Sequence, residues 1–256
     1  MKQLFKAFSA ENIKLKHSGI LTTAILLALV TPIIGLCFSI YLYFTEKADT
    51  TEPIYVFYSV SDQLVLAFIN LFYPIIIIVT ASRIAQLEHR NNTWQLMETQ
   101  PVKRATLLIA KFLKAYQICF LSIIAFMLGI VIVTLVTYTL YPKSEIIHLS
   151  LDWVLIIKKT IALTFGTGFL LALIYSLSVR FSNSFLSIII GVGTLLLGPI
   201  LSTFNMLPKW FPTTILTNSL KVDSDLGYWL TYNEYLGILA TLIILVFLTF
   251  WYINKN

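Results

Sequence analysis

The chain of 256 residues is 58% hydrophobic and only 12% charged, whereas soluble domains average roughly 45–50% and about 25%. A soluble fold of this length has too high a surface-to-volume ratio to bury so much apolar surface. The composition therefore excludes an ordinary soluble domain and predicts a protein solvated by lipid.

The chain begins with a short basic segment that precedes the first apolar run. Residues 1–19 are polar and basic, and the run Ile20–Phe44 is too long for the apolar core of a signal peptide and lacks a small-residue cleavage site. We therefore expect this run to remain in the protein as its first membrane span.

Six apolar stretches are long enough to cross the hydrocarbon core of a bilayer, which takes about 20 residues of helix. None shows the alternation over about ten residues that marks the strands of a membrane barrel, so helices are expected to satisfy the backbone in lipid. The predicted fold class is an all-α membrane protein, in which residues 1–256 form a single transmembrane domain. The predicted spans are Ile20–Phe44, Leu64–Ala81, Ile118–Tyr138, Thr160–Val179, Phe185–Phe204 and Tyr235–Ile253.

The start of the fourth span depends on two adjacent lysines, Lys158 and Lys159, which interrupt the apolar run that begins at Trp153. One lysine at the centre of a span costs about 2.5–3.5 kcal/mol on insertion scales, so the pair is expected at the membrane interface. Ser150–Ile157 then either lies on the membrane surface or continues the helix outward.

The basic residues are distributed unevenly between the two sides of this six-span arrangement. The side that holds both termini and the segment between spans two and three carries 12 of the 18 Lys and Arg residues and only three of the 12 acidic residues. Because Lys and Arg collect in cytoplasmic loops, both termini are expected in the cytoplasm. This distribution explains the net charge of +6 as a topology signal, without a nucleic-acid partner.

The sequence shows no motif for catalysis or metal binding. It contains no phosphate loop, no H-E-x-x-H and no G-x-S-x-G, and its two cysteines, Cys37 and Cys119, lie inside apolar runs without metal-ligand spacing. The predicted spans are nearly free of the ionisable residues that ion-coupled transporters place at membrane depth. We expect no catalytic residue, metal or cofactor in this chain, and energy for any uphill transport must come from a partner.

The segment between spans two and three, Arg83–Lys114, is long and basic. Its part Gln86–Thr99 is rich in helix formers and predicts a short surface helix, and Pro101 ends that helix and suits the first turn of the next one. The apolar side chains that share one face of the predicted helix are Leu87, Trp94 and Met97.

Two interpretations of this segment follow from the residues. In the first it is a lipid connector, with Trp94 anchored among headgroups and basic side chains on anionic lipid. In the second it is a docking element that receives force from a cytoplasmic motor and passes it to spans two and three. The basic side chains concerned are Lys103, Arg104, Lys111 and Lys114.

The order of residues in this segment resembles the cytoplasmic loop of permease subunits in bacterial type-two ATP-binding-cassette (ABC) exporters. The version N-N-T-W followed by P-V-K-R is most similar to the lantibiotic-immunity branch, and so is the amino-terminal A-E-N-I-K-L-K. A Gly-Thr pair usual in the family is replaced by Asn92–Thr93, which suits that branch. The matching positions, to which the resemblance assigns coupling to the ATPase, are Glu88, Thr93, Trp94, Pro101, Arg104 and Lys111.

The resemblance implies a permease subunit of an ATP-driven exporter in the bacterial cytoplasmic membrane. ATP and Mg are then bound by a separate cytoplasmic ATPase subunit, and a second permease, identical or paralogous, completes a dimer. The implied cargo is a peptide antibiotic or another amphipathic or lipid-like molecule, removed for self-protection or resistance. The alternative is a non-transport membrane module, such as an assembly factor or a sensor.

Two further elements are implied by the resemblance. Residues 1–19 are expected to form an amphipathic helix along the inner leaflet, with lysines toward the headgroups. The outer segment Asn205–Asn233 has the composition of short re-entrant helices and equally of an ordinary external loop with aromatic anchors. The residues assigned to the interfacial helix are Leu4, Phe5, Phe8, Glu11 and Lys14.

Overall fold

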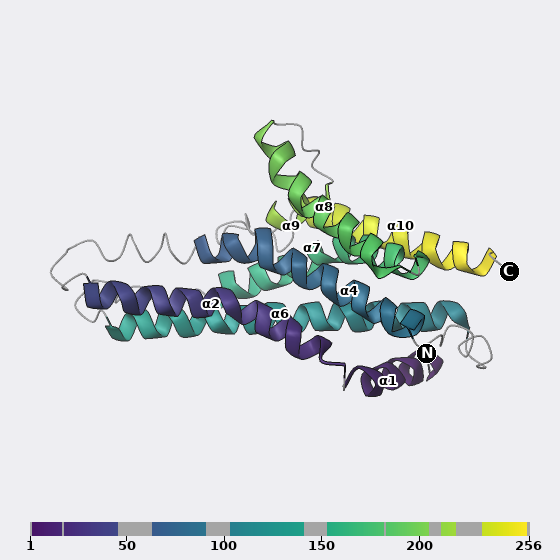
Figure 1. Ribbon diagram of the computed structural model, residues 1–256, viewed down its shortest axis with the longest axis horizontal. Coiled ribbons are helices and arrows are strands. Elements are labelled where there is room, and N and C mark those ends of the chain that lie inside the picture. The colour runs from purple at the N-terminus through teal and green to yellow at the C-terminus, as the bar shows by residue number, and fades with distance from the viewer. Residues whose placement is uncertain are drawn as a thin grey trace.

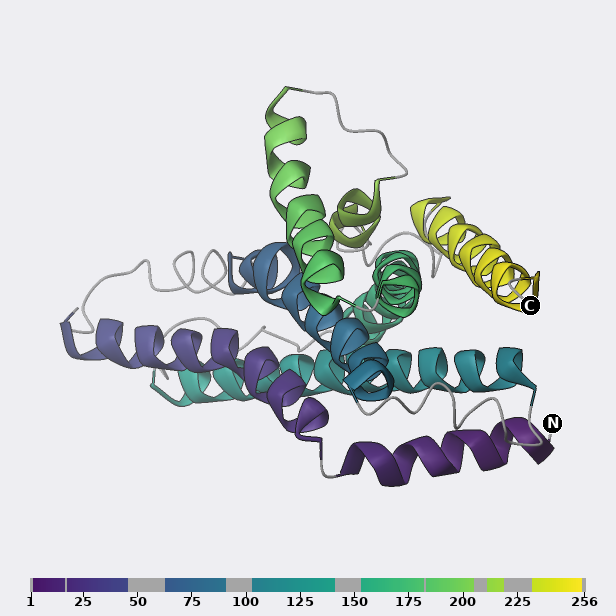
Figure 2. The same ribbon diagram turned by 45° about the vertical axis from the view of Figure 1, so that its right-hand side comes forward.

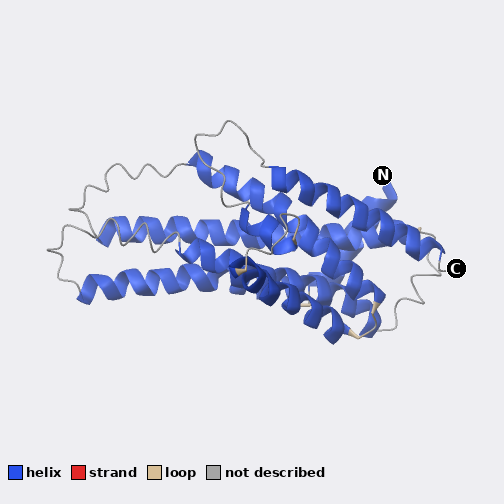
Figure 3. Ribbon diagram, turned by 90° about the horizontal axis from the view of Figure 1, so that it is seen from above, coloured by secondary structure: helices blue, strands red, loops and turns tan. Residues whose placement is uncertain are grey.

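The fold is a bundle of helices, which a computed structural model describes for residues 2–16, 18–45, 63–90, 103–140, 153–181, 183–204, 211–218 and 232–254. Figure 3 shows helices and short connections, and no strand, within these ranges. The all-α prediction is confirmed for this part of the chain. The elements in chain order (Figure 1) are α1 (Lys2–Lys16), α2 (Ile20–Thr45), η1 (Phe68–Phe72), α4 (Tyr73–Arg90), α6 (Arg104–Leu140), α7 (Trp153–Arg180), α8 (Ser184–Thr203), α9 (Pro212–Asn218) and α10 (Tyr232–Asn254).

Within the described residues, four stretches of helix are both long and apolar enough to cross a membrane, which indicates an integral membrane protein. Two shorter apolar helices, Phe185–Gly198 and Glu234–Phe250, coincide with the predicted fifth and sixth spans, so the count of six crossings stays a prediction. Figures 1 and 2 show α1 and the carboxyl end of α10 at the same end of the molecule, as an even number of crossings requires. The four long stretches are Ile20–Thr45, Gln63–Leu87, Arg104–Thr137 and Ile156–Arg180.

Three helices extend beyond the predicted spans. α6 begins at Arg104 and has 37 residues, or about 55 Å at 1.5 Å per residue, against a hydrocarbon core of about 30 Å. α7 begins at Trp153, so residues 153–157 continue the helix outward, the second of the two alternatives, and Lys158 is buried. α4 continues to Arg90, so Gln86–Arg90 belong to the second span helix and do not begin a separate surface helix.

The second span contains a π-helical segment immediately before Pro74. In η1 the Tyr73 N–H bonds to the carbonyl of Phe68, a wider turn than in an α-helix. Proline has no N–H, and its ring crowds the carbonyl four residues before it, so a local departure from α geometry relieves that conflict. Phe68 stacks on Phe126 of α6 with a centroid distance of 3.7 Å, which holds the irregular segment in the core.

The core lies among η1, α4, α6 and α7, and two tyrosines, the half-buried Tyr116 and the buried Tyr175, connect α6 to α7. Tyr116 of α6 donates to the Thr164 carbonyl at 2.6 Å, and Tyr175 of α7 donates to the Leu108 carbonyl at 3.0 Å. Helices in lipid associate through packing and hydrogen bonds rather than the hydrophobic effect. These reciprocal bonds therefore make α6 and α7 a rigid pair.

The described part of the outer segment 205–233 includes the short helix α9. Its residues Pro212, Ile215 and Leu216 are buried, and it packs against α7, α8, α10 and η1; Figure 2 shows it between α8 and α10. Residues 212–218 thus pack against the bundle through their apolar side chains, and the re-entrant alternative stays a prediction. Residues 205–210 and 219–231 lie outside the described ranges.

α2 packs along α6, and Gly129 of α6 allows the close approach. A Cβ on Gly129 would lie 2.6 Å from Cγ of Pro32 in α2, and the proline ring cannot rotate away. Gly193 of α8 offers the matched contrast, because a Cβ there meets no atom within 4 Å.

We expect Gly129→Ala to separate α2 from α6 and to lower the free energy of unfolding by about 1–3 kcal/mol, as overpacking does. Thermal unfolding in detergent measures this, with Gly193→Ala as the control for the intrinsic gain of alanine in a helix. Equal melting temperatures for the two variants would contradict the close-approach argument.

Candidate functional site

The projecting first part of α6 carries α1 along its side. α1 packs against α6, as Figure 2 shows, and Ala7 forms a small buried cluster with Leu107 and Ala110 of α6. Since these α6 residues precede the predicted third span, the contact lies at the end of the bundle where the segment between α4 and α6 begins and ends. The site is therefore a helix pair at one end of the bundle.

A buried ion pair joins the two helices. Glu11 Oε1 lies 2.8 Å from Lys111 Nζ, and the two residues are only 4% and 1% exposed. Lys14 Nζ lies 3.5 Å from the same carboxylate oxygen, from the exposed side of α1. A short charge-assisted bond of this kind is strong, and removing one partner would leave a charge buried without compensation.

A second set of polar contacts flanks the ion pair. Lys114 donates to the side-chain oxygen of Asn12 and to Gln117 Oε1 at 2.7 Å. Its ammonium also lies 5.3 Å from the centroid of the Phe8 ring, within cation–π range. Two lysines of α6 thus bind α1, so the lipid-connector interpretation is wrong for Lys111, whose ammonium is buried inside the protein.

α1 has two apolar faces, where the sequence predicted one. Leu4 and Phe8 are half-buried, and Leu15 joins the main core, so this face lies toward the bundle. Phe5 and Ile13 point the other way, with 77% and 72% of their surface exposed. An outward apolar face on a helix rich in lysine has the pattern of an interfacial helix in contact with lipid.

The structure brings together only some of the residues that the sequence assigned to coupling. Lys111 meets Glu11, and Arg104 is the half-buried first residue of α6. Glu88 lies in α4, but its side chain is outside the described part, as are Thr93, Trp94 and Pro101 altogether. Their role stays a prediction.

Sequence reasoning missed that Glu11 and Lys111, assigned to separate elements, contact each other, and it assigned no role to Asn12 or Gln117. One signal was available, because Glu11 is the one acidic residue of α1 among four lysines. A carboxylate at that position is repelled by an anionic membrane surface and attracted by a buried ammonium, so it indicates a cationic partner within the protein.

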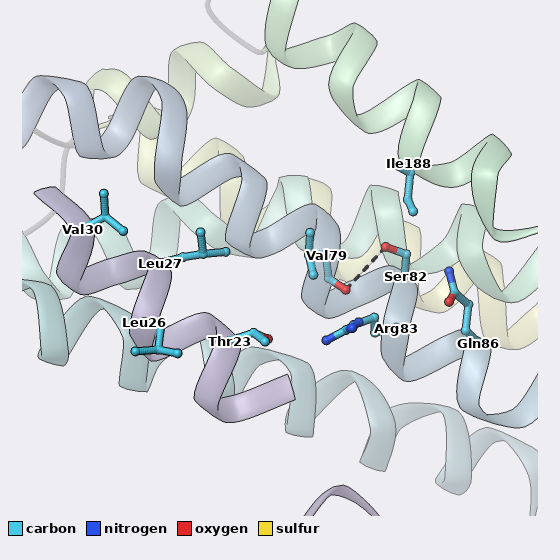
Figure 4. Close-up of a pocket in the computed structure, with 9 residues that line it drawn as sticks. All are labelled: Thr23, Leu26, Leu27, Val30, Val79, Ser82, Arg83, Gln86 and Ile188. Atoms are coloured by element: carbon cyan, nitrogen blue, oxygen red, sulfur yellow. Dashed lines mark hydrogen bonds between the residues drawn. The ribbon is translucent and has the colours of Figure 1, made fainter. Parts of the chain in front are cut away.

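A groove of about 550 Å³ opens between α2, α4 and α8, and Figure 4 shows its lining. Its walls are apolar except for Thr23 on α2 and one edge of α4, where Ser82, Arg83 and Gln86 follow one another over a turn. The buried Ser82 hydroxyl donates to the Ile78 carbonyl, with the Val79 carbonyl farther away at 3.5 Å, whereas Arg83 is exposed and extends toward α2 in Figure 4. The remaining lining residues are Thr23, Leu26, Leu27, Val30, Val79 and Ile188.

The groove has the size and character of a ligand site. Pockets that bind ligands range over about 300–1,000 Å³ and combine apolar walls with a few polar groups. The apolar pattern of the sequence predicts Arg83 and Gln86 outside the second span, which it ends at Ala81, with Arg83 in the connecting segment and Gln86 at the start of a surface helix. Because α4 continues to Arg90, both side chains instead lie on the wall of the groove.

The fold and the site together define an integral membrane protein with a helix pair at one end of its bundle and a groove between α2, α4 and α8. A family model described as ABC-2 family transporter protein matches residues 7–198, from α1 through most of α8. The chain belongs to this family and is a membrane permease component of an ABC transporter. Such membrane domains are generally not catalytic themselves and work with a separate ATPase subunit. Comparisons with curated proteins and with solved structures gave no match.

We expect Glu11→Gln to release α1 from α6, because breaking a buried ion pair costs about 3–5 kcal/mol. Hydrogen exchange of the α1 amides measures the release, and thermal unfolding in detergent measures the loss of stability. The double variant Glu11→Leu with Lys111→Met should recover most of the loss, since it leaves no charge buried.

The control for this experiment is Lys16→Gln, which removes an exposed charge from the last turn of α1. We expect no change in the exchange of α1 for this variant. Equal effects of Lys16→Gln and Glu11→Gln would show that the buried pair is not what holds α1.

Proposed function

We propose that this permease is half of the membrane pathway of an ATP-driven exporter in the bacterial cytoplasmic membrane. It crosses the membrane six times with both termini in the cytoplasm. The asymmetry of Lys and Arg along the chain supports this orientation. The family assignment favours transport over the assembly or sensor module that the sequence left open.

The observation that carries the proposal is the attachment of α1 to α6 by the buried pair of Glu11 and Lys111. α6 is one continuous helix that packs against α1, α2, α4, α7 and α10. A displacement of its projecting end is therefore transmitted to most of the bundle, with α1 moving as part of the same body.

The ATPase subunit would supply that displacement. It binds ATP and Mg and, in our proposal, docks on the segment that joins the end of α4 to the start of α6. Glu88, Thr93, Trp94 and Pro101 belong to this segment or its border, and Arg104 begins α6. A push on the segment acts on both helices at once, and α4 forms one wall of the groove.

The groove between α2, α4 and α8 is our proposed path for the cargo. Its apolar walls suit an amphipathic molecule that enters from the membrane, such as a peptide antibiotic or a lipid-like compound, and Arg83 and Gln86 would bind its polar part. A second permease, identical or paralogous, would cover the exposed apolar side chains beside the groove. These include Leu26 and Ile33 of α2 and Phe185, Ile189 and Leu196 of α8.

We expect Trp94→Ala and Glu88→Gln to abolish co-purification of the ATPase and stimulation of its hydrolysis, while membrane insertion stays intact. Trp153→Ala is the matched control, because Trp153 is an exposed tryptophan at the start of α7. Pull-down from native membranes and ATP hydrolysis by the purified complex are the measurements. If both variants keep full coupling, the docking role is wrong.

We also expect a strain that lacks this protein to become sensitive to a membrane-active peptide, and Arg83→Gln to restore only part of the protection. Arg83→Lys, which keeps the positive charge, should restore more. Growth inhibition across a panel of peptides measures this. Unchanged sensitivity of the deletion strain across the panel would remove the peptide as cargo.

A further inference from the structure

A second groove, of about 510 Å³, lies between α7 and α10. It shares no helix with the groove between α2, α4 and α8. Its mouth is open, since Ile243 and Phe247 are 68% and 65% exposed, whereas Val179 and Leu248 form a closed floor at 5% and 6%. The groove is therefore open along the side of the bundle and has an apolar floor.

The polar groups of this groove are confined to one helix and gather toward its end. Ser176 and Arg180 are the polar lining residues, both on α7, and Arg180 is its last residue. The Ser176 hydroxyl already donates to the Leu173 carbonyl at 2.8 Å. Arg180 is exposed, and its guanidinium lies 6.0 Å from the Phe181 ring. The groove thus has a cation at one end and apolar side chains along the rest.

The position of the charge and the apolar floor indicate which kind of ligand fits this groove. A guanidinium presents several N–H donors in a planar fork that matches a phosphate group, while the apolar floor suits a hydrocarbon chain. Basic sites between membrane helices at the cytoplasmic side bind the headgroups of anionic lipids. Under the proposed topology the turn after Arg180 lies at that side, and the groove faces the acyl region of the same leaflet.

We propose that the groove between α7 and α10 binds an anionic phospholipid, with its phosphate on Arg180 and one acyl chain along Ile243 and Phe247. The volume lies within the range of about 300–1,000 Å³ that holds ligands. The lipid fills the space between α7 and α10 and reinforces their packing. Because the site uses none of the residues assigned to cargo or to the ATPase, it is a structural lipid site and does not depend on the transport cycle.

The test uses the purified, delipidated full chain in detergent, titrated with phosphatidylglycerol or with phosphatidylcholine of the same acyl chains. Native mass spectrometry counts the bound lipid, and thermal unfolding reports the stabilisation. Wild type should bind one phosphatidylglycerol roughly tenfold more tightly than phosphatidylcholine. Both lipids offer a phosphate to Arg180, but the choline cation of phosphatidylcholine cancels the net negative charge that attracts the guanidinium.

Two variants test the contact with the lipid headgroup and the contact with the acyl chain separately. Arg180→Gln should remove the preference for phosphatidylglycerol and leave the weaker binding of phosphatidylcholine. Ile243→Trp, at an exposed position, should fill the groove and abolish binding of both lipids while Arg180 stays in place. Lys103→Gln is the control, because it removes one exposed basic charge away from the groove and should keep the preference.

The proposal is overturned if Arg180→Gln keeps the preference or if Ile243→Trp binds both lipids as wild type does. It is also overturned if glycerol phosphate, which has no acyl chain, stabilises the protein as much as phosphatidylglycerol. Unfolding without lipid serves as the check on folding for each variant. Since the measurement needs neither ATPase nor cargo, its outcome is independent of the proposed export function.

Discussion

The buried contact between Glu11 and Lys111 is the constraint on which the arrangement of α1 against α6 depends. It holds two charges away from water, and separating them would leave each charge buried without its partner. The pair lies at 2.8 Å, and the contacts of Lys114 with Asn12, Gln117 and Phe8 surround it. A surface ion pair would contribute little. A buried one imposes a large penalty on any state that breaks it, so α1 and the first part of α6 move together or not at all.

The attachment of α1 to α6 matters because α6, with 37 residues, is longer than the hydrocarbon core of a bilayer is thick. Its 37 residues reach from the contact with α1 through the bundle, and the hydrogen bonds of Tyr116 and Tyr175 connect it to α7. An ABC-2 permease generally works with a separate ATPase subunit. Contacts at Lys111 and Tyr116 near the start of α6, and at Phe126 farther along, make this continuous helix suited to the transmission of displacement that we propose.

The two grooves show how similar apolar linings can serve different ligands. Each combines apolar walls with one exposed arginine, but Arg83 lies beside Ser82 and Gln86 on a wall shared by three helices, and Arg180 ends a helix beside a groove formed by two. The first has polar groups on two helices, for which we propose an amphipathic cargo. The second has its polar groups, Ser176 and Arg180, on one helix and a buried apolar floor, for which we propose a lipid.

The sequence by itself determined the all-α fold class and the presence of long apolar helices, because apolar length is a local property that a bilayer reads directly. It left open whether Ser150–Ile157 continues the fourth helix outward, and it assigned Gln86–Arg90 to a separate surface helix, whereas the structure includes them in α4. Only the tertiary structure decided that Lys111 is buried against Glu11, that Phe5 faces outward while Phe8 faces α6, that Arg83 lines a groove and that α9 is packed among the spans. Each of these depends on contacts between residues far apart in the chain, and the rotation of one helix against another is set by packing that no local pattern encodes.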